Sequence, residues 1–256
     1  MFFERHGELF IGRFGELLKN RDVFHGFSTR KGGVSKSPYN WLNLGDKTGD
    51  LSSRVRENRR RFFSLLGVSE ANLAIPQQVH GDRILRVTEP GNYPETDGLI
   101  TNTPGIGLIV QVADCVPLFF YDSFQKAVGL VHAGWRGTML KISAKAVQKM
   151  GSYFGTNPKD LQIFVGPSIG PCCYEVGADV ASRFLRKYIT DKRLDLWQSN
   201  RDQLLEAGVK PDKIVMSNLC TACHPEWFFS YRANGGETGR MMAVLGLGKK
   251  KLDFNV

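Results

Sequence analysis

The stretch that decides the fold is Gly107–Arg136, which reads GLIVQVADCVPLFFYDSFQKAVGLVHAGWR. It contains two short apolar runs, Val116–Tyr121 and Ala127–Val131, both rich in β-branched or aromatic residues. The polar, turn-like break Asp122–Lys126 separates them. Two apolar runs of this length around a polar break are typical of a β-hairpin, which we therefore expect here.

A thiol and an imidazole flank this predicted hairpin. If the turn is centred between Ser123 and Phe124, Cys115 and His132 lie opposite each other at the open end. Directly opposed residues on one sheet face have Cβ atoms roughly 4.5–5.5 Å apart. That distance suits two ligands of one metal ion, at about 2.3 Å for Zn–S and about 2.0 Å for Zn–N. It equally suits a Cys–His nucleophile pair, so spacing alone leaves both chemistries open.

Composition and charge narrow the class of protein. The chain has 256 residues, 42% of them hydrophobic, which is enough for a full core. The formal charge of +9 could mark an anionic substrate or a nucleic-acid partner, but the basic residues are scattered apart from Arg54–Arg61 and Lys249–Lys251. No apolar run approaches the roughly 20 residues of a membrane span, and the first ten residues do not resemble a signal peptide. We therefore expect a cytoplasmic monomer with no nucleic-acid or membrane partner.

The order of the predicted elements favours an α+β fold. Hairpins dominate the middle of the chain and helices cluster later, without the regular βαβ alternation of a doubly wound sheet. Four helices are predicted, the first with Asp50 as its N-cap and the second with Thr138: 51–66, 138–150, 176–188 and 194–207. Because the chain shows no linker or internal repeat, we expect residues 1–256 to form a single domain of mixed β-sheets with flanking helices.

Four cysteines lie outside the hairpin. The total of five is odd, and without a signal peptide it indicates reduced thiols. Cys220-Thr-Ala-Cys223-His224 matches the attachment pattern of haem c, which requires export, so we expect a local turn with buried thiols instead. A structural zinc would need a second ligand pair, and the adjacent Cys172 and Cys173 have the wrong spacing. We expect one of these two to be buried as a small apolar residue.

Nine short blocks follow one another in a specific order between residues 25 and 245. They are His25–Ser35 (HGFSTRKGGVS), Asn43–Gly45 (NLG), Gln77–Gly81 (QQVHG), Thr96–Thr101 (TDGLIT), Ala113–Pro117 (ADCVP), Val131–Thr138 (VHAGWRGT), Gly166–Gly177 (GPSIGPCCYEVG), Phe228–Arg232 (FFSYR) and Thr238–Arg240 (TGR). Together they resemble the bacterial laccase-domain family. This family is also called the YfiH type, the polyphenol-oxidase type, or the peptidoglycan editing factor and purine nucleoside phosphorylase family.

The resemblance implies a fold and a site. The implied fold is a single α+β domain likened to a cytotoxic-factor-type cysteine hydrolase. The implied metal ligands are the histidine of the QVHG block, the cysteine of ADC and the histidine of VHAGW, which are His80, Cys115 and His132. Family members are described as phosphorolysing adenosine, inosine and methylthioadenosine, as deaminating adenosine, or as oxidising polyphenols. A further implied role is the removal of wrongly incorporated amino acids from peptidoglycan precursors.

Our leading hypothesis is a zinc-dependent purine nucleoside phosphorylase with adenosine deaminase activity. Cys115 and His132 would be the catalytic residues, and three protein ligands leave one zinc position open. Candidate substrate-binding residues are Arg30, Asn43, Arg136 and Arg232, because guanidinium groups bind phosphate in a bidentate manner.

Three alternatives stay open at this point. A copper-dependent polyphenol oxidase could use the same two histidines and cysteine, although a full laccase needs more histidines than the five present. A metal-free hydrolase or amidase acting on a cell-wall precursor could use Cys115 as nucleophile and His132 as base. A basic RNA-binding module would leave the cysteine and histidine pattern unexplained.

Overall fold

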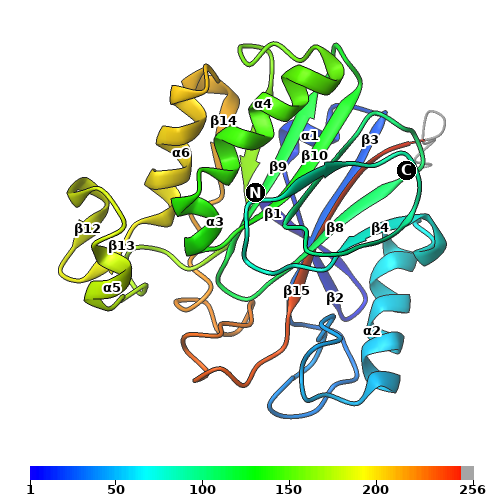
Figure 1. Cartoon of the computed structure of the whole chain (residues 1–256). Helices are drawn as coiled ribbons and strands as arrows, with labels where there is room; N and C mark the ends of the chain where they lie inside the picture. Colours follow the sequence, from blue (N-terminus) through cyan, green and yellow to red (C-terminus); the bar gives the residue numbers. More distant parts are fainter. Residues whose placement is uncertain (249–256) are drawn as a thin grey trace.

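Two β-sheets form the centre of the structure (Figure 1). The computed structural model describes residues 1–248. The seven-stranded sheet contains, in spatial order, β1 (Phe2–His6), β2 (Leu9–Arg13), β3 (Val23–Ser28), β15 (Met241–Leu247), β8 (Gly107–Val112), β4 (Leu73–Pro76) and β6 (Gly91–Tyr93). The six-stranded sheet contains β14 (Ile214–Met216), β11 (Gln162–Val165), β9 (Val116–Asp122), β10 (Ala127–Ala133), β7 (Gly98–Thr101) and β5 (Ile84–Arg86). The strands β12 (Ile189–Thr190) and β13 (Arg193–Leu194) pair separately.

Helices cover the outer face of each sheet. On the six-stranded sheet lie α3 (Trp135–Met139), α4 (Ile142–Phe154) and α6 (Leu196–Glu206), and on the seven-stranded sheet lies α2 (Ser52–Leu65). Figure 1 shows α4 and α6 on one side of the strands and α2 on the other. Single turns occur at α1 (Gly15–Leu18) and α5 (Ala178–Ala181), and 3₁₀ turns at Glu70–Asn72, Arg186–Tyr188 and Pro211–Lys213. The predicted single-domain, mixed α+β architecture is confirmed.

The central hairpin β9–β10 is buried on both faces, which explains its uninterrupted apolar sequence. Along β9, Leu118 and Phe120 pack toward the helices, whereas Phe119 and Tyr121 pack between the two sheets. The predicted hairpin is therefore confirmed. Its register differs from the predicted one, however, because Asp122 pairs with Ala127 and the turn lies one residue later.

The helix predictions were partly wrong. The predicted helix 51–66 is α2, but Asp50 is not its side-chain cap, because its carboxylate accepts hydrogen bonds from Ser35 and Asn43 and the cap position is Leu51. The predicted helix 138–150 is broken into α3 and α4 by Lys141, whose φ is +61°. The predicted helix 194–207 corresponds to α6.

The predicted helix 176–188 is wrong. Only the four residues of α5 and a short 3₁₀ turn are helical in this segment. Its apolar residues are spread over these two turns and the loop between them, so their spacing does not come from one continuous helix face. The basic segment Lys249–Lys251 lies outside the described residues.

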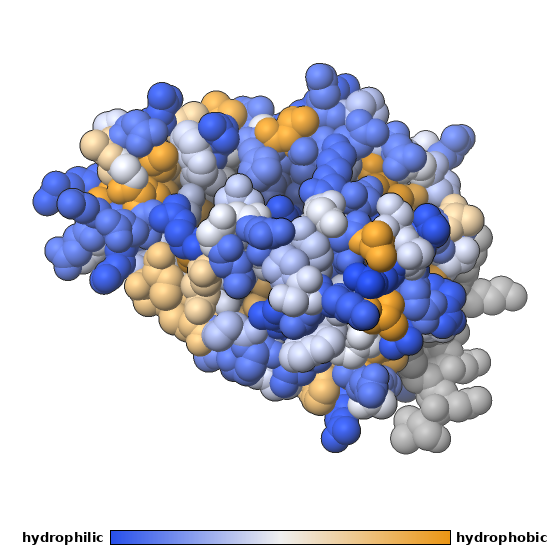
Figure 2. Space-filling model, turned by 90° about the horizontal axis from the view of Figure 1, so that it is seen from below, coloured by the Kyte–Doolittle hydropathy of each residue, from blue (hydrophilic) through white to orange (hydrophobic). Residues whose placement is uncertain are grey.

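The surface carries no obvious apolar docking area on the face shown in Figure 2. That face is predominantly hydrophilic, and hydrophobic residues occur on it in separate patches. Isolated hydrophobic surface residues are normal in folded proteins and need no partner. Among residues 1–248, every helix is too short or too polar to cross a lipid bilayer.

Candidate metal centre

Two neighbouring crossovers bring chemically active side chains to one end of the two sheets. Strands β4 and β8 are parallel neighbours, and after each of them the chain passes to the six-stranded sheet, into β5 and β9 respectively. His80 lies on the first crossover and Cys115 on the second. His132 lies near the end of β10, which is antiparallel to β9. The topology therefore collects the three residues at the same end of the molecule.

The geometry of these three side chains fits a shared metal ion. The ligand atoms of His80, Cys115 and His132 all lie within 4.8 Å of one another. The two imidazole rings have centroids 4.9 Å apart and are inclined by 79°. His132 is only 2% exposed, Cys115 is half-buried and His80 is exposed. The group is therefore anchored in the protein on one side and accessible from the other.

The true register shows why a glycine follows His132 by two residues. His132 pairs with Pro117 and Ala133 with Val116, so the next position places Gly134 against Cys115. A Cβ atom on Gly134 would lie 3.1 Å from the Cys115 sulfur and 3.2 Å from Cδ2 of His80. Its φ of −74° is accessible to any residue, so the glycine provides space rather than an unusual backbone conformation.

Asp97, for which sequence reasoning predicted no role, holds two of the ligands in place. This fully buried carboxylate accepts a hydrogen bond from Nδ1 of His132 at 2.8 Å. It also accepts the backbone N–H groups of Val79, His80 and Gly81 at 3.1, 2.9 and 2.8 Å. Because an ionised carboxylate only accepts, Nδ1 of His132 carries the proton and Nε2 is directed to the site. The signal that could have found Asp97 is its position beside β7, the neighbour of β10.

Without a metal, this arrangement favours a thiolate–imidazolium pair. Burial alone would raise the pKa of Cys115, but the adjacent His132 and His80 outweigh it and lower the pKa to about 6. Burial alone would lower the pKa of His132, but Cys115 and Asp97 raise it to about 9. Burial would also raise the pKa of Asp97, yet His132 and the backbone N–H groups lower it. The thiolate is the form that binds metals.

Further hydrogen bonds fasten the two crossovers. The side chain of Gln78 donates to the carbonyl of Gln111 and accepts its N–H, each at 2.8 Å. Asp114, next to Cys115, adopts a φ of +90°, a strained value for a residue with a side chain. Its carboxylate accepts hydrogen bonds from Thr221 Oγ1 at 2.6 Å and from the backbone N–H of Arg232 at 2.7 Å. These contacts tie the centre to two loops of the cleft wall.

The centre opens into a cleft of about 640 Å³. This volume lies in the range of small-molecule sites, which is roughly 300–1,000 Å³. Three arginines line it, namely Arg136, Arg232 and Arg240, and so do three aromatic residues, namely Trp135, Tyr174 and Tyr231. Each guanidinium lies over one of these rings, 4.5 to 5.6 Å from its centroid. The cleft thus combines a metal centre with positive charge and aromatic surface.

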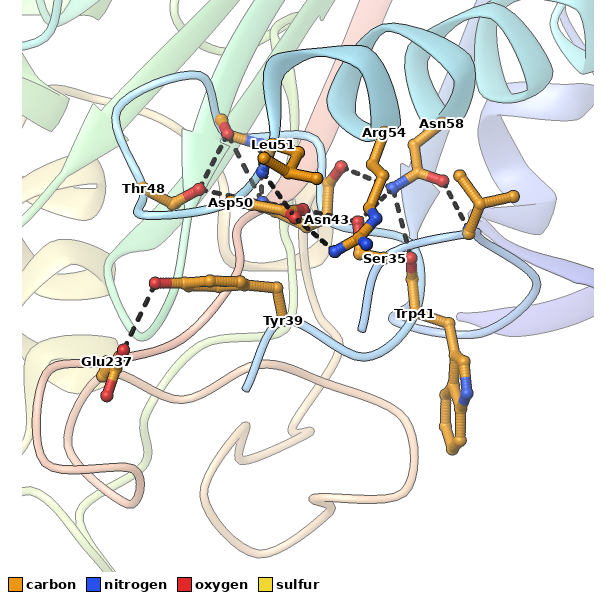
Figure 3. Close-up of polar contacts among 12 residues, drawn as sticks. Ser35, Tyr39, Trp41, Asn43, Thr48, Asp50, Leu51, Arg54, Asn58 and Glu237 are labelled. Carbon is orange, nitrogen blue, oxygen red and sulfur yellow. Dashed lines mark hydrogen bonds and ion pairs between the residues drawn. The ribbon is translucent and has the colours of Figure 1, made fainter. Parts of the chain in front are cut away.

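Two of the predicted substrate-binding residues do not line this cleft. The guanidinium of Arg30 donates to the carbonyls of Asn40 and Pro225, both at 2.8 Å, and stacks on Phe229. Asn43 is fully buried and donates to Thr48 and Asp50 within the polar cluster drawn in Figure 3.

Asn43 nevertheless contributes to the cleft indirectly, through a contact with Arg240. Its side-chain oxygen accepts the backbone N–H of Arg240 at 2.9 Å. It thereby positions Arg240, a residue of the TGR block to which sequence reasoning gave no role. His25, another chemically capable residue, is buried away from the centre, where its Nε2 accepts the N–H of Phe14.

Comparisons with known proteins agree with this architecture. The family model described as multi-copper polyphenol oxidoreductase laccase matches residues 24–248. The purine nucleoside phosphorylase YlmD of Bacillus subtilis is 34% identical, with 89% of this chain and 90% of that protein covered. A purine nucleoside phosphorylase of Deinococcus radiodurans is 39% identical, with coverages of 91% and 92%. The crystal structure of Bacillus licheniformis YfiH superposes with a TM-score of 0.89 at 35% identity, covering 96% of this chain and 98% of that one. The chain therefore belongs to the laccase-like YfiH family.

Proposed function

We propose that this protein is a zinc-dependent purine nucleoside phosphorylase acting on adenosine, inosine and methylthioadenosine. The observation that carries the proposal is the His80–Cys115–His132 centre at the base of a cleft lined by arginines and aromatic rings. Relatives of this chain bear the name purine nucleoside phosphorylase, which supports the reaction class.

The donor set suits zinc. Two imidazoles and one thiolate, with a carboxylate behind one imidazole, match catalytic zinc sites, in which a fourth position stays open. When bound there, zinc would supply Lewis-acid polarisation of a substrate oxygen or activation of a water molecule. His80, Cys115 and His132 would hold it, and Asp97 would keep His132 in the tautomer that binds.

The arginines of the cleft provide a binding site for phosphate, the second substrate of phosphorolysis. In phosphorolysis, a phosphate oxygen bonds to C1′ of the ribose while the glycosidic C–N bond breaks, and the released base takes up a proton. We assign the phosphate to Arg136, Arg232 and Arg240, because guanidinium groups form charge-assisted, bidentate hydrogen bonds to such anions. Among residues 1–248, the Arg136 guanidinium makes only the stacking contact with Trp135, which leaves its donors available for phosphate.

The aromatic residues suit the purine base. Tyr174 and Trp135 are half-buried at the cleft, where a planar base can stack on them. Burial, followed by the nearby Cys115, raises the pKa of Tyr174 to about 12. Its hydroxyl therefore stays protonated at neutral pH and can donate a hydrogen bond to the base or to phosphate.

Adenosine deamination is a second proposed activity of the same centre, because an open metal position next to a nucleoside site is also what hydrolytic deamination requires.

Multicopper phenol oxidation is disfavoured by the distribution of the histidines. A cluster of coppers needs many imidazoles in one place, whereas His6, His25 and His224 are absent from the group formed by His80, Cys115 and His132. We also propose that the enzyme acts as a cytoplasmic monomer, independently of nucleic acid and membranes.

The test is product analysis on a nucleoside panel with purified, zinc-loaded protein. We expect free base and ribose 1-phosphate from inosine and adenosine only when inorganic phosphate is present, and inosine from adenosine without it. Cys115→Ala should lower the phosphorolytic rate at least a hundredfold while the far-ultraviolet circular dichroism stays unchanged. Full activity of this variant, or base release that ignores phosphate, would refute the proposal.

A further inference from the structure

Four cysteines outside the described centre gather at a second position. Cys172 and Cys173 follow β11, whereas Cys220 and Cys223 follow β14. Strands β11 and β14 are parallel neighbours, so the segments that follow them leave the sheet at the same end. An additional bridge between Ser168 and Cys220 keeps the two segments paired beyond the strands. The four sulfur atoms all lie within 4.8 Å of one another, and we call this group the four-cysteine cluster.

This convergence corrects the expectation that adjacent cysteines could not join the Cys220-x-x-Cys223 pair. Neighbouring side chains point apart in an extended strand, but Cys172 and Cys173 lie in a tight turn. In that turn the N–H groups of Cys173 and Tyr174 both donate to the carbonyl of Gly170 at 3.0 Å. The curled backbone lets both sulfurs face Cys223, at 3.5 and 3.4 Å.

The sulfur spacing is compatible with a metal tetrahedron. Four sulfurs at about 2.3 Å from a central zinc are about 3.8 Å apart along each edge. A disulfide would bring two sulfurs to about 2.05 Å, whereas all the cysteines here are free. Tetrahedral sites of four thiolates select zinc or iron among the common metals.

A backbone hydrogen bond to the buried Cys220 sulfur matches a metal-binding loop. The Cys220 sulfur, on a side chain that is 5% exposed, accepts the N–H of Gly170 at 3.2 Å. Backbone donors aimed at a sulfur stabilise the thiolate form, which is the form that ligates metals.

We propose that the four-cysteine cluster binds one structural zinc ion, separate from the ion held by His80, Cys115 and His132. A closed site of four cysteines is typical of structural zinc, because it leaves no position for substrate. Two of its cysteines, Cys172 and Cys223, are exposed, so the ion has a path of entry from solvent.

This ion would fix one wall of the cleft. Tyr174, which lines the cleft, directly follows Cys173. Thr221, whose hydroxyl donates to Asp114 beside the first centre, directly follows Cys220. Zinc bound to the four-cysteine cluster would join the two loops that carry these residues. The second site is therefore expected to stabilise the catalytic wall without touching substrate.

The test is the metal content of the full-length protein, purified under reducing conditions and equilibrated with zinc. We expect two zinc ions per chain in the wild type. Cys172→Ser/Cys223→Ser should carry one, and so should Cys115→Ala, because each removes a different site. Combining all three substitutions should remove both ions. The two serine substitutions lie at exposed positions, and circular dichroism will verify that the fold is retained.

A spectroscopic readout makes the assignment independent of activity. Cobalt(II) bound to four thiolates gives intense sulfur-to-metal charge-transfer absorption. The double serine variant should lose most of this absorption and keep only the weaker contribution of the single Cys115 thiolate, whereas Cys115→Ala should keep most of it. The proposal is overturned if the double serine variant retains the wild-type zinc content. It is also overturned if mass spectrometry finds the cluster disulfide-bonded after reducing purification, or if the cluster holds iron in place of zinc.

Discussion

Replacing Asp97 by asparagine should damage the metal centre and the fold together. The four donors divide evenly between the two carboxylate oxygens: His132 Nδ1 and the His80 N–H bond to Oδ1, and the Val79 and Gly81 N–H groups bond to Oδ2. An asparagine offers only one acceptor oxygen, so one pair of donors must face an N–H₂ group. Either the turn carrying His80 loses two hydrogen bonds, or His132 is pushed toward the wrong tautomer.

The size of the effect follows from these contacts. A hydrogen bond to a charged group contributes about 1.5–3 kcal/mol, so losing two in a buried position should lower the free energy of unfolding by about 3 kcal/mol or more. Loss of the partner behind a histidine ligand typically costs about 10–100-fold in metal affinity, which corresponds to about 1.4–2.8 kcal/mol.

Two measurements separate the two effects. Urea unfolding of the metal-free protein reports the loss of stability, and competition with a chromophoric chelator reports the affinity for zinc. Asp82→Asn is the matched control, because this carboxylate lies in the same turn but pairs with Lys145 near the surface. The control should change stability by less than about 1 kcal/mol. If Asp97→Asn behaves like the control in both assays, the role given to this carboxylate is wrong.

Three further predictions address the glycine beside the centre, the phosphate site and the reactive thiol. Gly134→Ala should weaken zinc binding at least tenfold, because its Cβ would crowd Cys115 and His80. The control Gly151→Ala in α4 should bind zinc normally, because its Cβ would make only an ordinary contact, at 3.5 Å, with the Thr156 carbonyl oxygen. Arg136→Gln should raise the KM for phosphate about 10–100-fold with a smaller change in the KM for inosine, because it removes a charged hydrogen bond of about 1.5–3 kcal/mol. The control Arg83→Gln, at an exposed position, should change neither KM. In metal-free protein, the rate of Cys115 alkylation, followed by peptide mass spectrometry, should rise through pH 6 and level off by about pH 7, because the lowered pKa of about 6 makes the thiolate the main form above pH 6. A rate that climbs only above pH 8 would contradict the pairing with His132.

The sequence was most informative where local pattern and tertiary burial agree. The hairpin β9–β10 was predictable because burial on both faces leaves a continuous apolar run around a polar turn. Its register was not, because Asp122 serves both as the last residue of β9 and as the acceptor for the N–H groups of Phe124 and Gln125 in the turn. A count of residues to the middle of the polar break cannot distinguish these roles.

Polar residues in loops were harder to assign than the hairpin. Arg30 and Asn43 have the chemistry of ligand-binding groups, yet both bond to partners within the protein, in their own loop and in distant segments that carry Pro225 and Arg240. Asp97, in contrast, gave no signal beyond its place before a strand, because its function depends on three N–H groups from a turn far away in the sequence. In each case, the deciding partner is set by the tertiary fold.

The crossing of the chain between the two sheets has a consequence for assembly. His80 lies on the connection from β4 to β5, and Cys115 lies on the connection from β8 to β9. Both connections run from the seven-stranded sheet to the six-stranded sheet, to which His132 belongs. An ion bound by all three residues would link the two sheets, and its site would be complete only after both sheets have packed against each other. Tight metal capture would thus be reserved for chains that have completed their tertiary structure, and half-assembled chains would bind the ion weakly.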